Sequence, residues 1–131
     1  MKNTTEITDI DDIKLLVDEF YSRVRQDELL ADIFNEVIQD QWPVHWKKMY
    51  TFWQTILLKE HTYYGSPFPP HASLPVTEQH FERWLKLFHE TLDDYFHGTT
   101  AEEAKWRSVR MAEMFLMKIN YYQNSQTKPI I

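Results

Sequence analysis

Two histidines stand where an imidazole could bind a metal ion. His71 closes the loop segment that begins at Tyr63, directly after Pro69 and Pro70. The prolines remove backbone donors and restrict the chain, so they fix the approach of this imidazole. His45 lies on the apolar face of an expected helix, where a charged imidazolium is costly. A neutral imidazole is a good metal ligand, although a single histidine on such a face is more often a core residue.

Two polar aromatic residues, Tyr21 and Trp84, fall on the inward faces of expected helices. Each carries one hydrogen-bond donor that needs a partner when it is buried. Each donor could pair with a backbone carbonyl. If both point into one pocket, they could instead stabilise an electron-rich ligand there.

A third set of polar residues is spaced by four along one expected helix: His89, Asp93 and His97. This spacing can hold zinc or another divalent metal. The neighbouring Glu90 and Asp94 are also polar, which favours a solvated helix face. A helical bundle that binds a non-haem metal through these residues remains an alternative.

Composition limits the class of protein. The chain has 131 residues, no cysteine, a net charge of −6 and an isoelectric point near 5.4. We expect one domain over residues 1–131.

The acidic balance argues against a nucleic-acid partner. No apolar run suits a membrane span and the N-terminus has no signal-peptide core, so we expect a cytoplasmic protein without a membrane partner. The absence of cysteine excludes thiolate ligands and iron–sulfur clusters, but not cofactors bound through histidine.

Helical spacing of apolar residues recurs along the chain, and no segment alternates with the period of a strand. We expect an all-α fold, with helices at about residues 8–26, 28–39, 42–59, 77–97 and 100–122 and tails at 1–8 and 123–131 that fray. We expect Thr8 or Asp9 to cap the first helix, Pro43 to lie in the first turn of the third, and Thr77 to cap the fourth, which Gly98 ends. A capping box at Thr100–Glu103 is expected to open the last helix. Residues 60–76 form a long aromatic loop, which is usually functional in a compact domain.

Five strings in register resemble the truncated haemoglobins, specifically their third subgroup. The resemblance covers roughly residues 10–122. The strings are Phe20-Tyr21-x-x-Val24-Arg25-x-Asp27, Leu30-x-x-Ile33-Phe34-Asn35, Trp42-x-x-His45 with Phe52-Trp53, Tyr64-Gly65-x-Pro67-x-x-x-His71-x-x-Leu74-Pro75, and Phe81-x-x-Trp84-Leu85-x-Leu87-Phe88. The resemblance implies a truncated globin-like helical fold that encloses a b-type haem (iron protoporphyrin IX).

The resemblance also implies roles for individual residues. His71 would be the proximal ligand of the haem iron, Tyr21 and Trp84 distal hydrogen-bond donors, and His45 the residue at the distal gate. The remaining cofactor contacts would be Phe34 at the haem edge, Met49 in the neighbouring distal position, Lys48 as a propionate partner, and Phe52, Phe68 and Phe81 as pocket walls.

The implied function is reversible binding of O₂, NO and CO. Two distal donors would slow the release of O₂, which suits NO dioxygenation or peroxide chemistry better than storage. Either reaction would need an external reductase. A haem-based gas sensor or interaction module without turnover is the alternative, because a globin fold alone does not establish catalysis.

Overall fold

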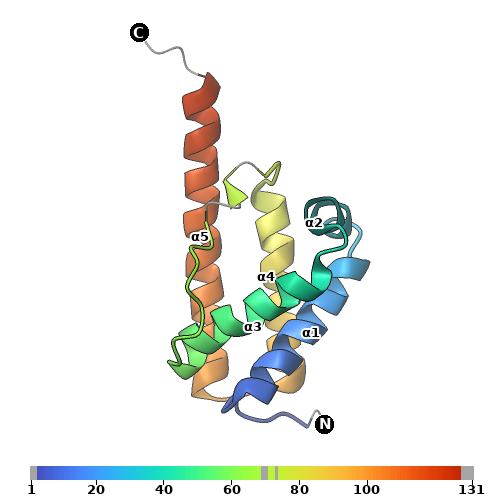
Figure 1. The fold of residues 1–131 in the computed structure, drawn as a ribbon, viewed down its shortest axis with the longest axis vertical. Coiled ribbons are helices and arrows are strands. Elements are labelled where there is room, and N and C mark those ends of the chain that lie inside the picture. Colours follow the sequence, from blue (N-terminus) through green and yellow to red (C-terminus); the bar gives the residue numbers. More distant parts are fainter. Residues whose placement is uncertain (1–2, 69–70, 73, 128–131) are drawn as a thin grey trace.

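The structure is a computed structural model that describes residues 3–68, 71–72 and 74–127, with side chains omitted for residues 122 and 124–127. Within these ranges the chain forms helices and no strand, which confirms the all-α prediction. The helices are α1 (Ile10–Gln26), α2 (Ala31–Ile38), α3 (Trp42–Leu58), α4 (Glu78–Tyr95) and α5 (Thr99–Thr127). Figure 1 shows the long α5 beside α4, with α3 crossing in front of α1. No described helix is long and apolar enough to cross a bilayer.

Helix α1 follows directly from its sequence pattern. Asp9 is the N-cap, and its carboxylate accepts a hydrogen bond of 3.2 Å from the backbone N–H of Asp12. This satisfies one of the donors that the first turn leaves unpaired. The buried stripe is the one expected from three- and four-residue spacing: Ile13, Leu16, Val17, Phe20, Tyr21 and Val24.

Helix α2 begins later than predicted, at Ala31 and not near Glu28. The carboxylate of Asp27 explains the delay, because it accepts hydrogen bonds of 3.0 Å from the backbone N–H groups of Leu29 and Leu30. These bonds form a tight turn before the helix. The same carboxylate binds Arg83 of α4 at 2.6 Å, which ties the start of α2 to α4.

Helix α3 has the predicted boundaries. Pro43 lies in its first turn, and Lys59 ends the helix with a left-handed φ of 61°. Helix α4 starts after Thr77, also as predicted, but ends at Tyr95 and not at Gly98. The chain then turns extended, so the predicted end was wrong by about two residues.

The N-terminal residues explain the early end of α4. Thr5 donates its backbone N–H to the carbonyl of Tyr95 at 3.2 Å and accepts from the N–H of His97 at 3.0 Å. This short bridge, together with buried Ile7 and Phe96, holds part of the segment 1–8 that we expected to fray. Residues 1 and 2 lie outside the described residues.

Helix α5 differs most from the prediction. It begins at Thr99, so Thr100 lies inside the helix and is not its cap, and it continues to Thr127, past the expected tail at Gln123. Residues 128–131 lie outside the described ranges. Its buried face consists of small and apolar residues, namely Ala101, Ala104, Ser108, Ala112, Phe115 and Ile119, while Trp106, Met114 and Tyr121 are exposed.

Aromatic rings form the centre of the core where α1, α3 and α4 meet. Phe88 stacks on Trp53 with centroids 4.9 Å apart and on Trp84 with centroids 5.3 Å apart. Phe20 meets Trp84 and Phe88 edge-on. Such pairs add about 0.5–1.5 kcal/mol each beyond the area that they bury. They hold the inner faces of α1 and α4 in place beside a cavity.

Candidate functional site

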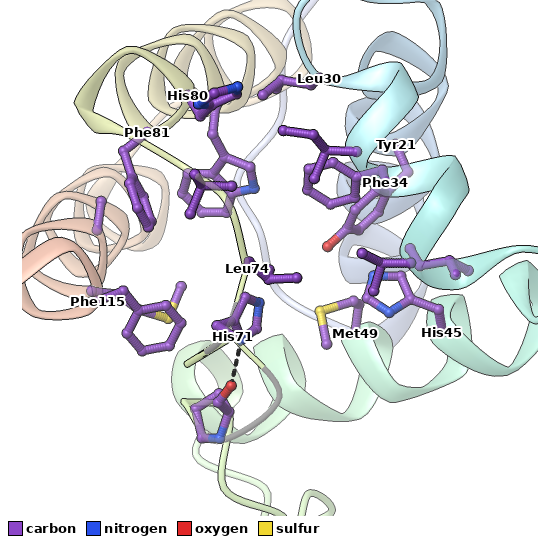
Figure 2. A pocket seen from close by; sticks show the side chains of 18 of the residues that line it. Tyr21, Leu30, Phe34, His45, Met49, His71, Leu74, His80, Phe81 and Phe115 are labelled. Atoms are coloured by element: carbon purple, nitrogen blue, oxygen red, sulfur yellow. Dashed lines mark hydrogen bonds between the residues drawn. The ribbon is translucent and has the colours of Figure 1, made fainter. Parts of the chain in front are cut away.

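A cavity of about 220 Å³ lies between the five helices and the loop before α4. Its walls are mostly apolar, and they gather residues that lie up to 94 positions apart in the chain, from Tyr21 to Phe115. Eight of the residues singled out in the sequence line it: Tyr21, Phe34, His45, Met49, Phe52, His71, Phe81 and Trp84. Figure 2 shows several of these side chains around one space.

His71 presents one ring nitrogen to this cavity. Its Nδ1 lies 2.6 Å from the carbonyl oxygen of Pro67 (Figure 2). The backbone N–H of His71 donates to the carbonyl of Phe68 at 2.7 Å. Because a carbonyl oxygen only accepts, Nδ1 carries the hydrogen and Nε2 keeps a lone pair. Burial lowers the pKa of His71, although the bond to Pro67 opposes that effect. The neutral ring, oriented by a backbone carbonyl, can therefore bind a metal through Nε2.

Tyr21 faces the cavity from α1. Its side chain is 4% exposed, and Figure 2 shows its hydroxyl pointing into the pocket. Among the residues that the structure describes, none hydrogen-bonds this hydroxyl. Burial raises the pKa of Tyr21, so the phenol keeps its proton. The hydroxyl is an available donor in apolar surroundings.

His45 lies on α3 beside Tyr21. The two rings meet edge-on, with centroids 5.1 Å apart, and His45 meets Trp42 in the same way at 5.9 Å. The Nε2 atom of His45 is buried and has no partner within the described ranges. Burial is the largest cause that lowers the pKa of His45 to about 4, and the nearby Lys48 ammonium acts in the same direction. The ring is neutral near pH 7.

Trp84 reaches the cavity from α4, where its ring stacks on Phe88 with an interplanar angle of 9°. No described residue accepts a hydrogen bond from its indole N–H. Met49 and Phe52 continue the wall along α3 from His45, at the four- and three-residue steps that the sequence suggested. The cavity therefore contains a basic nitrogen from the loop and two unpaired donors from separate helices.

Two predicted contact residues lie away from the cavity wall. Lys48 is exposed on α3 and does not line the cavity. Phe68 is half-buried, with its ring 5.4 Å from that of Phe115 and the ammonium of Lys118 5.0 Å from its centroid. Since Phe115 does line the cavity, Phe68 stands one ring behind the wall.

Sequence reasoning missed two parts of the lining. His80 lies on the cavity wall, four residues before Trp84 and therefore on the same helix face. The spacing of four residues from Trp84 could have indicated this position. The neighbours of His80 are polar, however, and they suggested an exposed side chain. Phe115, Met111 and Ala112 form the wall contributed by α5.

The alternative metal site is not formed. His89 hydrogen-bonds Ser108 at 3.1 Å, Asp93 binds Lys105 at 2.5 Å, and His97 pairs with the hydroxyl of Thr4 at 2.7 Å. His97 also lies beyond the end of α4, which breaks the helical spacing. Among the described residues, no three of His, Asp and Glu gather as a metal site.

Comparisons with known proteins agree on one family. The model of the bacterial-like globin family matches residues 6–118. The group 3 truncated hemoglobin ctb of Campylobacter jejuni is 36% identical over 116 residues, which are 86% of each chain. The crystal structure of the group III truncated hemoglobin from Campylobacter jejuni superposes with a TM-score of 0.79 at 34% identity, covering 91% of this chain and 95% of that one.

The family match over residues 6–118 includes every residue that lines the cavity, from Tyr21 to Phe115. The chain belongs to the bacterial-like globin family, among the group 3 truncated haemoglobins.

Proposed function

We propose that this globin binds O₂, NO and CO reversibly at a haem b whose iron is held by His71, with Tyr21 and Trp84 as donors to the gas. Globins of this family bind haem and diatomic gases, so the coarser function follows from the family itself. The chain has no cysteine for covalent attachment of haem, which favours haem b over a c-type haem.

The cavity residues fit a haem. His71 offers the lone pair of Nε2, and the bond from Nδ1 to Pro67 fixes the plane of its ring. When bound, haem supplies an iron with one coordination position open to a diatomic gas. Phe34, Phe52 and Phe81 are apolar walls that keep water from the site.

Tyr21 and Trp84 would set the affinity for O₂. Their donors have no partner among the described residues, so no existing bond has to break before they donate to a ligand in the cavity. Each such bond contributes on the order of 1–2 kcal/mol. Since about 1.4 kcal/mol is a tenfold change in affinity, two donors would slow the release of O₂ by roughly a hundredfold.

His45 and Met49 would shape the space around the gas. The ring of His45 packs against Tyr21, and its neutral state avoids a charge beside the ligand. Met49 adds a thioether one helical turn away. Lys48, exposed on the same helix, remains a proposed partner for a haem propionate, and Phe68 would support the wall through Phe115.

One observation carries this proposal: His71, whose Nε2 holds a lone pair, and Tyr21, whose hydroxyl has no partner among the described residues, line the same apolar cavity. Slow release favours reactions of the gas over storage. We propose NO dioxygenation, in which NO, O₂ and one electron give nitrate, or the reduction of peroxide to water by two electrons and two protons. Either reaction consumes electrons, so an external reductase is the proposed partner.

The test is the rate at which the reduced haem protein releases O₂, measured by stopped-flow absorbance. Replacing Tyr21 or Trp84 with Phe should each speed release by roughly tenfold, because each change removes one donor. Tyr50→Phe is the matched control, since the hydroxyl of Tyr50 bonds Asp18 away from the cavity. Unchanged rates in both cavity variants would remove the proposal that these residues bind the gas.

A second measurement separates an enzyme from a gas sensor. The haem protein is supplied with NO, O₂ and a reductase, and nitrate is counted over many turnovers. More than one nitrate per haem supports dioxygenation. A single equivalent, with no turnover of peroxide either, would favour a sensor that binds gas without catalysis.

A further inference from the structure

We propose that His80 holds one of the two haem carboxylates by donating a hydrogen bond from its Nε2 atom. The inference rests on the proposed function, because it requires haem in the cavity. It assigns a role to a histidine that the sequence left without one.

The hydrogen-bond partners of His80 fix which nitrogen is the donor. Its Nδ1 accepts from the backbone N–H of Thr77 at 3.0 Å, and the hydroxyl of Thr77 lies 3.1 Å from the same atom. A backbone N–H can only donate, so Nδ1 holds a lone pair and the hydrogen sits on Nε2. His71 has the opposite arrangement, because its Nδ1 donates to the Pro67 carbonyl. His71 therefore offers the cavity a basic nitrogen, and His80 offers it an N–H donor.

The position of His80 suits a charged group of the ligand. It lines the cavity from the first turn of α4, next to the exposed residues Thr77, Glu78 and Gln79. Figure 2 shows it at the edge of the pocket far from His71. A carboxylate loses several kcal/mol of hydration in apolar surroundings, so it must lie where water or a donor can reach it. Half-buried His80 offers both, whereas the donor of Tyr21 is deep in the molecule.

The charges near His80 do not oppose an anion on the cavity side. Glu78 and Glu82 each lie two residues away and are exposed. Two residues turn an α-helix by about 200°, so both carboxylates lie on the opposite face from His80. The first turn of a helix also carries partial positive charge, which favours an anion there.

His80 would bind a haem carboxylate in addition to Lys48 and would not replace it. Lys48 is exposed on α3 outside the cavity lining, while His80 lies on α4 within it. The two contacts would come from different helices.

The test uses two replacements that keep the start of α4 intact. Glu and Gln at the third helical position both accept from the N-cap N–H, as His80 does here. His80→Gln also keeps an N–H donor, whereas His80→Glu removes the donor and adds a like charge. Wild type and both variants are loaded with protohaem or with its dimethyl ester, which has no carboxylate. The rate of haem transfer to excess apomyoglobin is followed by absorbance.

With protohaem, His80→Glu should lose haem roughly tenfold faster than wild type, because a charge-assisted bond is lost. His80→Gln should stay within about threefold of wild type, since one donor remains. With the dimethyl ester, all three proteins should release haem within about twofold of one another.

The inference is overturned if His80→Glu and His80→Gln lose protohaem at the same rate, or if their difference persists with the ester. Failure of the proposed function looks different: the wild-type protein would then take up neither form of haem. Lys48→Met, loaded in the same way, should add its own effect to that of His80→Glu, because the two contacts are separate.

Discussion

The imidazole of His45 meets the phenol ring of Tyr21 edge-on, with centroids 5.1 Å apart and ring planes at 84°. This geometry is favourable for aromatic pairs and holds both rings at a defined angle beside the cavity. The Tyr21 hydroxyl and the His45 Nε2 both lack a hydrogen-bond partner in the part of the chain that the structure describes. The two polar groups of Tyr21 and His45 are thus held in apolar surroundings, which affects the stability of the protein as well as ligand binding.

Acid should destabilise the haem-free protein through His45. Burial lowers the pKa of His45 from 6.5 to about 4. Between these values the unfolded chain binds a proton that the folded chain does not, so stability falls as the pH drops from about 6.5 towards 4. From pH 7 to pH 5 the loss from this group is about 2 kcal/mol. Urea unfolding at both pH values measures it.

His45→Leu should reduce the difference in the free energy of unfolding between pH 7 and pH 5 by that amount. An unaltered pH dependence in His45→Leu would show that the buried imidazole titrates like an exposed one.

Asp27 should contribute to stability through two partners at once. Burial alone would raise the pKa of Asp27, but the bonds from Arg83, Leu30 and Leu29 outweigh it and the pKa is lowered. Its carboxylate is 8% exposed. Asp27→Ala removes the ion pair and the two hydrogen bonds that form the turn before α2, so the free energy of unfolding should fall by about 2–3 kcal/mol.

Arg83→Met removes only the ion pair and should cost about 1 kcal/mol, since the guanidinium is partly exposed. Chemical denaturation of the three proteins gives both differences. Equal losses in the two variants would mean that the hydrogen bonds from Leu29 and Leu30 to Asp27 contribute nothing to stability.

Trp42 and Trp46 on α3 allow a comparison that measures how much one hydrogen bond contributes to stability. Trp42 donates from its indole to the side-chain oxygen of Asn35 at 3.2 Å, whereas the buried indole nitrogen of Trp46 has no partner in the described ranges. Trp42→Phe should therefore destabilise the protein by about 1 kcal/mol more than Trp46→Phe. Thermal unfolding of both variants checks the order, and a larger loss in Trp46→Phe would contradict it.

Much of the site could be predicted because helical spacing is a strong constraint. Tyr21, His45 and Trp84 lie on apolar faces of helices with clear three- and four-residue steps, and those faces do line the cavity. The loop with His71 was recognisable because its prolines interrupt an otherwise helical chain.

The remaining features depend on contacts between distant segments. The early end of α4 needs Thr5, which pairs with Tyr95 and His97 near the other end of the chain, and no local pattern reveals such a bridge. Thr100–Glu103 has the residues of a capping box, yet α5 starts at Thr99, after Gly98 adopts a φ of 98°.

The wall from α5 was missed for a different reason. Its largest apolar residues, including Trp106 and Tyr121, are exposed, while small residues form most of the buried face. The largest apolar residues of this helix therefore do not mark its buried face. Lys48 and Phe68 do not line the cavity, so their contacts with haem remain predictions.

The central claim is that His71 binds the haem iron, and a haemin titration followed in the Soret region tests it most directly. Wild type should bind one equivalent of haemin with a sharp Soret band. His89→Ala, which alters a histidine bonded to Ser108 away from the cavity, should do the same. His71→Ala should lose the band or weaken it strongly. An unchanged band and affinity in His71→Ala would contradict the account.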